Sequence, residues 1–165
     1  AAAVRDRVDA GDFMLSLRLA TLADSDLILK WRNDPEAIAT STTQRGVTEA
    51  EHDRWYIKVL TDLTVHLYVA ETDGGAMEGQ RSIGMGRINE ERGVAVLSYS
   101  IDANYRGLGY GGELVAALTA KAYEFGYVSI QAVCRCSNTA SVRALLRQGF
   151  EIDPPELLQL RKKIK

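Results

Sequence analysis

A glycine-rich turn from Arg106 to Gly111 is the segment of this sequence best suited to chemistry. It joins an apolar strand pattern to a helix with one apolar face, and its glycines stand at positions 107, 109 and 111. The unpaired N–H groups of a first helical turn attract anions, and glycine lets the backbone approach an anion without an obstructing Cβ. Arg106 adds a positive charge at the rim. The turn therefore predicts a phosphate or pyrophosphate site, and a plain glycine-rich turn that opens a helix is the alternative.

The spacing of the turn excludes two other phosphate-binding motifs. It lacks the Lys-Ser/Thr pair that ends a nucleotide-triphosphate loop. Its glycines fall at every second position, and no parallel βαβ unit precedes them, so the dinucleotide fingerprint does not fit either.

Composition narrows the class of protein. The chain has 165 residues, which fits one domain, and 46% of them are hydrophobic, which suffices for one core. Lys plus Arg is 20 and Asp plus Glu is 22, so the formal charge is −2 and nucleic acid is disfavoured as a main partner. No apolar run is long enough for a membrane span, and the first ten residues are too charged for a signal peptide. We expect a cytoplasmic protein with no nucleic-acid or membrane partner, and either a monomer or a homodimer.

The two cysteines, Cys134 and Cys136, stand one residue apart with no second ligand cluster. His52 and His66 are the histidines of the chain. This set does not match a structural zinc site, so we expect no metal and reduced thiols.

Two periodicities predict the elements that position the turn. Alternating or continuous apolar runs predict strands, and apolar residues three and four apart predict helices. The predicted strands span 15–19, 66–71, 83–89, 94–101, 129–133, 150 onward and 157–164. The predicted helices span 21–31, 48–62, 109–125 and 138–148, and Thr48 with Glu51 forms a capping box for the second. This order indicates an α/β (α+β) domain with a mixed, mainly antiparallel sheet and helices on both faces.

The N-terminal segment 1–13 shows no period and ends in Gly11-Asp12. We expect a linker, a tag remnant or the tail of an upstream domain there, with Met14 as an alternative start. The domain itself is expected to span 14–165.

Two motifs together resemble a known superfamily. The run Arg106-Gly107-Leu108-Gly109-Tyr110-Gly111 resembles the Arg/Gln-x-x-Gly-x-Gly/Ala signature of GNAT acetyltransferases. Asn138-Thr139-Ala140-Ser141, followed by Gly149-Phe150, resembles the next landmark of that superfamily in the expected order. The resemblance implies a single GNAT domain, acetyl-CoA as co-substrate, and direct transfer of the acetyl group from thioester to amine.

The resemblance also implies which residues bind acetyl-CoA. Backbone groups near Tyr99–Ile101, at a splayed strand, would hold the pantetheine arm, and Asn138 and Ser141 would lie near the sulfur. The implied cofactor-binding residues are Ile101, Arg106, Gly107, Leu108, Gly109, Tyr110, Gly111, Asn138 and Ser141.

The N-terminal half carries a narrower resemblance. Trp31-Arg32-Asn33-Asp34-Pro35, followed by Glu51-His52 and Trp55, is similar to a branch that acetylates nucleotide-linked amino sugars in pseudaminic acid-type biosynthesis. That resemblance implies an acceptor pocket lined by four residues, namely Arg32, Asn33, His52 and Trp55. Trp-Arg-Asn-Asp also occurs in enzymes that acetylate protein N-termini. The alternatives are core packing for the tryptophans and an exposed helix position for His52.

The sequence departs from the superfamily pattern at both usual proton-handling positions. Val96 stands where many relatives carry a Glu, and Leu145 stands where many carry a Tyr. Deprotonating a lysine amine of pKa about 10.4 at neutral pH costs roughly 4–5 kcal/mol, whereas an amine on a sugar ring is less basic. The departures therefore favour a weakly basic acceptor.

Three residues are candidate substitutes for the missing side chains, namely Ser98, Tyr99 and Ser141. Ser98 would orient a water, and Ser141 would protonate the thiolate through a water. Core packing is the alternative for Tyr99. A peptide N-acetyltransferase and a CoA-binding module without catalysis remain the alternative functions.

Overall fold

A central sheet organises the protein in a computed structural model that describes residues 15–73, 79–153 and 159–163. The sheet has seven strands in the order β1-β2-β3-β4-β5-β7-β6. These strands are β1 (Leu15–Leu19), β2 (Val65–Thr72), β3 (Arg81–Glu91), β4 (Val94–Ile101), β5 (Ser129–Val133), β6 (Glu151–Asp153) and β7 (Gln159–Lys163). Neighbouring strands are antiparallel, except for the parallel pair of β4 and β5. The predicted linker at 1–13 lies outside the described residues.

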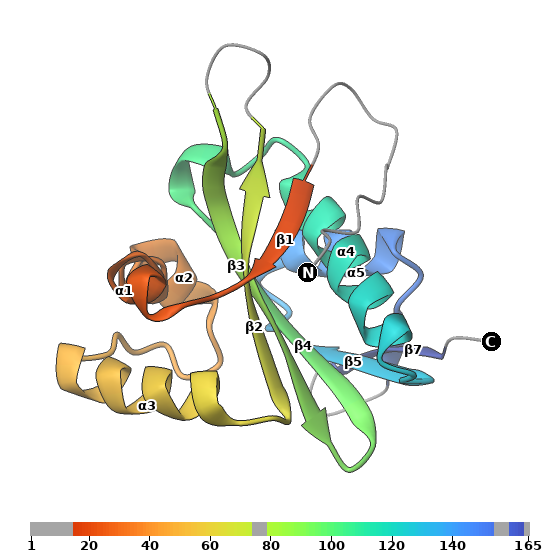
Figure 1. The fold of residues 1–165 in the computed structure, drawn as a ribbon. Coiled ribbons are helices and arrows are strands. Elements are labelled where there is room, and N and C mark those ends of the chain that lie inside the picture. Colours follow the sequence, from red (N-terminus) through yellow and green to blue (C-terminus); the bar gives the residue numbers. More distant parts are fainter. Residues whose placement is uncertain (1–14, 74–78, 154–158, 164–165) are drawn as a thin grey trace.

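Helices cover both faces of the sheet (Figure 1). One face carries α1 (Ser25–Arg32), α2 (Pro35–Thr40) and α3 (Glu49–Thr61), and the other carries α4 (Tyr110–Glu124) and α5 (Thr139–Arg147). Two buried clusters, one on each face, hold these layers together. The predicted mixed α/β sheet with helices on both faces is confirmed.

The core beneath α4 follows the predicted helical period. The buried positions include Leu114, Val115, Leu118 and Ala122, which the spacing placed on one face. Gly86 on β3 lets the helix lie close to the sheet, because a Cβ there would come within 2.7 Å of the Leu118 side chain. The long helix that starts at the glycine-rich turn is therefore anchored along its length to the central strands.

The helix beginning at Thr48 is capped as predicted. The Thr48 Oγ1 accepts a hydrogen bond from the Glu51 N–H at 3.2 Å, and the Glu51 carboxylate accepts one from the Thr48 N–H at 2.9 Å. This reciprocal pair satisfies two N–H groups that helix geometry leaves open. It fixes the start of α3, the helix that carries His52 and Trp55.

Three predicted boundaries are wrong in detail. The helix expected at 21–31 consists of a short 3₁₀ turn, Leu22–Asp24, followed by α1. The predicted helices omit α2, which Asp34 and Pro35 begin because the Asp34 carboxylate caps its first N–H groups. The strand predicted at 83–89 extends from Arg81 to Glu91, so the connection to the next strand is shorter than predicted.

The parallel pairing of β4 and β5 is short. It joins Ala95–Leu97 to Ile130–Ala132. From Ser98 to Ile101, β4 continues along β3 but has no partner on its β5 side among the described residues. The sheet therefore opens beside the strand that leads into the glycine-rich turn.

Candidate active site

The glycine-rich turn leaves the first turn of α4 open to a ligand. Gly107 has φ of 75° and Gly109 has φ of 90°, values that L-residues with a side chain rarely adopt. Gly109 is the N-cap of α4, and a Cβ added at either glycine would meet no heavy atom within 4 Å. Open space over the N-terminus of a 15-residue helix fits a pyrophosphate, because the free N–H groups and the helix dipole favour an anion.

The opening between β4 and β5 holds a hydroxyl pair. The Tyr99 and Ser141 hydroxyls are 2.9 Å apart, which joins β4 to the first turn of α5. The Asn138 side chain accepts a hydrogen bond from the Ser141 N–H at 3.2 Å and thereby begins α5. Burial raises the pKa of Tyr99, while its bond to Ser141 acts in the opposite direction. Tyr99 therefore keeps its proton at neutral pH.

Arg106 is paired within the protein. Its guanidinium donates to Asp34 at 2.6 Å and to Glu36 at 2.9 Å, and its Nε donates to the Ile101 carbonyl at 3.1 Å. Both carboxylates belong to the start of α2. Arg106 thus connects α2 to the end of β4 and fixes the entry to the glycine-rich turn.

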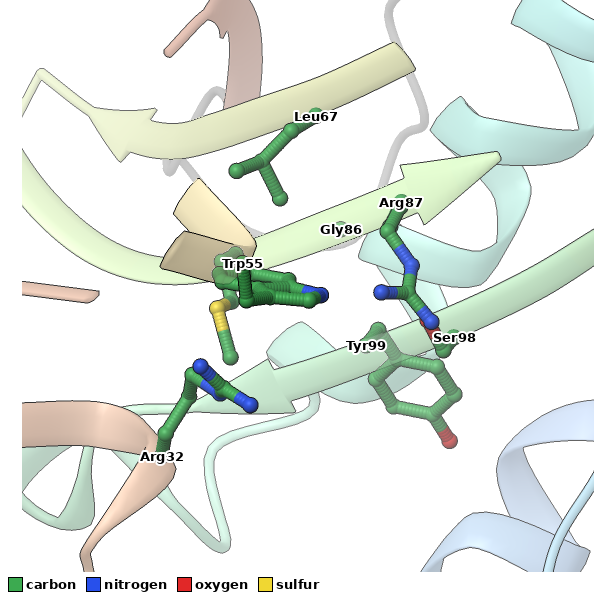
Figure 2. Close-up of a pocket in the computed structure, with 8 residues that line it drawn as sticks. Arg32, Trp55, Leu67, Gly86, Arg87, Ser98 and Tyr99 are labelled. Carbon is green, nitrogen blue, oxygen red and sulfur yellow. The ribbon is translucent and has the colours of Figure 1, made fainter. Parts of the chain in front are cut away.

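A pocket lies on the opposite side of the sheet from α4, between α1, α3 and strands β2 to β4 (Figure 2). Its volume of about 220 Å³ is below the 300–1,000 Å³ typical of sites for drug-sized ligands, so it suits a single ring or small group. The lining residues are Arg32, Trp55, Leu67, Met85, Gly86, Arg87, Ser98 and Tyr99. Through Ser98 and Tyr99 it reaches the opening between β4 and β5.

Trp55 stands between two arginines in this pocket (Figure 2). The Cζ of Arg32 lies 3.9 Å from the centroid of the Trp55 ring, and the Cζ of Arg87 lies 5.7 Å from it. Burial and the nearby Arg87 charge lower the pKa of Arg32, and burial lowers the pKa of Arg87. Both side chains still carry a full charge at neutral pH, because arginine is not deprotonated in proteins.

His52 lies behind the pocket and fixes one of its walls. It is 0% exposed, so the interpretation as an exposed helix residue is wrong. Its Nδ1 is 3.2 Å from Nη1 of Arg32, and its Nε2 is 3.1 Å from the Ser25 hydroxyl. Because a guanidinium only donates, we assign Nδ1 as the acceptor and place the ring proton on Nε2. Burial and the Arg32 charge lower the pKa of His52, which keeps the ring neutral.

The other residues singled out in the N-terminal half have structural partners. Asn33 exchanges two hydrogen bonds of 2.8 Å with the backbone of Val47 and does not line the pocket. Trp31 is 2% exposed, and its Nε1 donates to Asp102 at 2.8 Å. Of the four residues predicted for the acceptor pocket, Arg32 and Trp55 line it, while His52 and Asn33 support its walls.

Val96 and Leu145 both lie in apolar or paired surroundings. Leu145 is 1% exposed within the core, and Val96 pairs with Asn89 on β3. Neither can exchange a proton. Ser98 is exposed on the pocket side, opposite Arg87 in the register of β3 and β4.

Sequence reasoning missed Arg87. It lies in β3 between Gly86 and Ile88, and no local motif identifies it as a site residue. Its position at the pocket depends on the register of β3 against β4 and on the packing of α3 over the sheet. One signal was available. Arg87 is a charged residue two positions after the apolar Met85, where strand alternation predicts the same face.

An open helix N-terminus beside a splayed strand suits an anionic ligand such as a pyrophosphate. The family model described as "Acetyltransferase (GNAT) domain" matches residues 14–151. The chain therefore belongs to this family, and it is an acetyl-CoA-dependent N-acetyltransferase of the GNAT type.

Individual proteins agree with this assignment. The chain is 27% identical over 149 residues to "Uncharacterized N-acetyltransferase p20" of Bacillus licheniformis, covering 83% of this chain and 79% of that protein. Among solved structures, AAC(6')-Ib in complex with ribostamycin and coenzyme A has a TM-score of 0.76 at 22% identity, covering 90% of this chain and 93% of that one. Spermidine N-acetyltransferase from Vibrio cholerae, with CoA and spermine, has a TM-score of 0.71 at 18% identity, covering 90% and 92%.

Residues 15–73, 79–153 and 159–163 contain no group of three or more His, Cys, Asp or Glu side chains that could hold a metal ion. In the same part of the chain, no helix is both long and apolar enough to cross a membrane.

Proposed function

We propose that this N-acetyltransferase acts on a weakly basic primary amine of a nucleotide-linked amino sugar. One observation carries the proposal, which is the composition of the pocket. It combines an aromatic face with two arginines, and none of its lining residues is a carboxylate. Sugars and bases pack well on an aromatic face, while polar groups around it fix their orientation.

The absence of a carboxylate from the lining argues against a polycationic acceptor. Ribostamycin and spermine, the amines in the two similar structures, carry several positive charges. A polyamine in a pocket walled by Arg32 and Arg87 would meet like charges at short range, which disfavours binding. A sugar amine linked to an anionic carrier would instead bring negative charge near the two arginines, which favours binding.

For the co-substrate, we propose the residues around the glycine-rich turn. The N–H groups from Gly107 to Gly111 would hold the pyrophosphate, with Leu108 and Tyr110 contributing backbone donors. The unpaired edge of β4 up to Ile101 would hold the pantetheine arm. Arg106 would shape this site through its bonds to α2 as well as through its charge. Acetyl-CoA supplies an activated acetyl thioester, and the protein supplies the positions and the protons.

We assign to Tyr99, held by Ser141, the protonation of the departing thiolate. The Tyr99 hydroxyl lies at the opening of the sheet, is protonated at neutral pH, and is fixed by a 2.9 Å contact. Asn138 supports this arrangement by capping the helix that carries Ser141. Ser98, exposed at the pocket, would orient a water that accepts a proton from the amine. A weakly basic amine needs little more, because its neutral form is already abundant at neutral pH.

The experiment that tests this proposal is release of free thiol from acetyl-CoA in the presence of different acceptors. The acceptors are a nucleotide-linked 4-amino sugar, a peptide with a free N-terminus, and none. The proposal expects turnover with the sugar well above the reaction without acceptor.

Other outcomes would redirect or overturn the proposal. Turnover with the peptide alone would move the protein to the branch that acetylates protein N-termini. If no acceptor is turned over while acetyl-CoA still binds, the proposed acceptor is wrong.

A further inference from the structure

Arg32 and Arg87 are two positive charges without a counter-charge. Neither guanidinium has an ion pair or a hydrogen-bonded carboxylate among residues 15–73, 79–153 and 159–163. Within the same residues, the Nε of Arg87 is buried and has no hydrogen-bond partner. Glu51 and Glu91 act on these charges only through space.

Three arginines outside the pocket are paired. Arg18 binds both Asp24 and Glu71, at 2.8 and 2.6 Å. Arg45 binds Glu51, and Arg106 is held by the start of α2. Carboxylates of the chain neutralise these three arginines, whereas the two pocket arginines have no such pair among the described residues.

The unmatched pair is costly, so it needs a compensating partner. A buried charge that lacks a hydrogen-bonded partner disfavours the folded state, and two like charges near one ring add repulsion. The cation–π contact with Trp55 offsets part of the cost for Arg32, at 3.9 Å, but less for Arg87, at 5.7 Å. Nη1 of Arg32 moreover donates a hydrogen bond to His52 Nδ1, which holds the guanidinium toward the pocket.

We propose that Arg32 and Arg87, which flank Trp55, form an oxyanion clamp that binds a phosphate group of the acceptor. The inference rests on the proposed function, since it assigns the specificity of that same pocket. Guanidinium groups bind phosphate and carboxylate oxygens through paired, charge-assisted hydrogen bonds. The terminal nitrogens of Arg87 supply such donors at a pocket whose lining contains no competing acid.

The clamp also accounts for the size of the pocket. About 220 Å³ cannot enclose a nucleotide-linked sugar, so part of the acceptor must lie outside. A diphosphate held by the two arginines would place the sugar toward Ser98 and Tyr99, beside the opening of the sheet, and leave the nucleoside at the surface. The arginines thus act as specificity-determining residues for the acceptor.

Binding of uridine diphosphate to the CoA-loaded protein, measured by isothermal titration calorimetry, tests the clamp without requiring turnover. Saturating CoA occupies the pyrophosphate site at α4, so any further heat reports a second anion site. Glucuronate, a carboxylate sugar, is the parallel probe. We expect uridine diphosphate to bind, and Arg87→Met to raise its dissociation constant by about 10- to 100-fold, as expected for losing a charge-assisted hydrogen bond.

Two further variants keep the result interpretable. Arg32→Met is expected to weaken uridine diphosphate binding to a similar extent, which provides a second test if Arg87→Met folds poorly. Arg54→Met removes an exposed arginine from the same helix as Trp55 and is expected to leave binding unchanged. Circular dichroism and CoA binding establish that each variant is folded.

The outcomes separate this inference from the proposed function. Equal binding of uridine diphosphate to the wild type and to both pocket variants overturns the clamp. The clamp is also overturned if neither uridine diphosphate nor glucuronate binds to the wild type. Binding of glucuronate alone, lost in Arg87→Met, supports an oxyanion site and assigns it to a carboxylate. If no amino sugar is acetylated while uridine diphosphate binding is lost in Arg87→Met, the proposed function fails and the clamp stands.

Discussion

The two ends of the site use arginine in opposite ways. At the glycine-rich turn, Arg106 is held by Asp34 and Glu36, and the open N–H groups of α4 remain for the ligand. At the pocket proposed for the acceptor, Arg32 and Arg87 have no carboxylate partner among the described residues, and side chains form the lining. The comparison teaches that an arginine in a phosphate-binding motif can hold the motif in place, while arginines elsewhere in the site can be left without a carboxylate partner.

The largest effect is expected at the backbone end. Gly109→Val should lower the affinity for acetyl-CoA at least about 100-fold, because the loss of two charge-assisted hydrogen bonds is worth about 3 kcal/mol or more. A Cβ there would also occupy the open space over α4. Titration calorimetry with acetyl-CoA gives the measurement.

Gly93→Val is the matched control for that experiment. Gly93 also has a positive φ, 78°, and open space around its Cβ position, but it lies in the turn between β3 and β4. The Gly93→Val variant should lose a comparable amount of folding stability but keep the wild-type affinity for acetyl-CoA. Equal affinities in the Gly109 variant and the wild type would remove the glycine-rich turn from the cofactor site.

The next effect concerns Tyr99, where the two ends meet. Tyr99→Phe keeps the ring but removes the hydroxyl that contacts Ser141. We expect kcat to fall by about 100-fold, a typical contribution of general acid–base catalysis, with unchanged acetyl-CoA affinity. Steady-state kinetics over a range of pH measure the change in kcat. The variant should also lose the alkaline limb of the wild-type pH profile of kcat. An unchanged kcat would return Tyr99 to the role of core packing.

Unfolding experiments sharpen the comparison of the arginines directly. Arg106→Gln should lower the free energy of unfolding by about 1–3 kcal/mol, because it leaves the partly buried Asp34 without its partner. Arg87→Met should be neutral or stabilising, because it removes an unpaired charge from a partly buried site. Urea denaturation of both variants measures the two effects. A larger loss for Arg87→Met than for Arg106→Gln would contradict the distinction between them.

The smallest effect is a pH dependence from His52. Its pKa is lowered in the folded protein by burial and by Arg32, so the unfolded chain binds this proton more readily. Stability should therefore decrease as the pH falls from the ordinary histidine value of about 6.5 toward the lower folded value. Protonation also removes the acceptor that holds Arg32, so the KM for the acceptor should rise over the same range.

His52→Gln provides the control for that pH dependence. Glutamine can still accept a hydrogen bond from Arg32 but does not titrate. The variant should lose this part of the pH dependence, both in urea unfolding and in the KM. Identical pH profiles for the variant and the wild type would assign the dependence to another group.

Much of the fold was predictable because it is encoded locally. Strand β4, strand β5 and helix α4 follow apolar periods with clear glycine and cap signals, and their boundaries agree with the structure to within a residue. Helix α2 was missed, because Asp34 and Pro35 signal both the end of one helix and the start of another. Six residues are also too few to show a helical period.

The site was predictable at one end only. The glycine-rich turn lies within one continuous segment, so its chemistry is visible in the sequence. The pocket proposed for the acceptor draws Arg32, Trp55 and Arg87 from three elements that only tertiary packing brings together. The partners of Arg106 on α2, about 70 residues away in sequence, were hidden for the same reason.

The most direct test of the central claim compares kcat/KM for two acceptors in two proteins. The acceptors are a nucleotide-linked 4-amino sugar and the same sugar without the nucleotide, and the proteins are the wild type and Arg87→Met. The account predicts that the wild type prefers the nucleotide-linked acceptor by at least about tenfold, and that Arg87→Met loses this preference while retaining its rate with the free sugar. Equal preference in both proteins would contradict an acceptor site built on unmatched arginines.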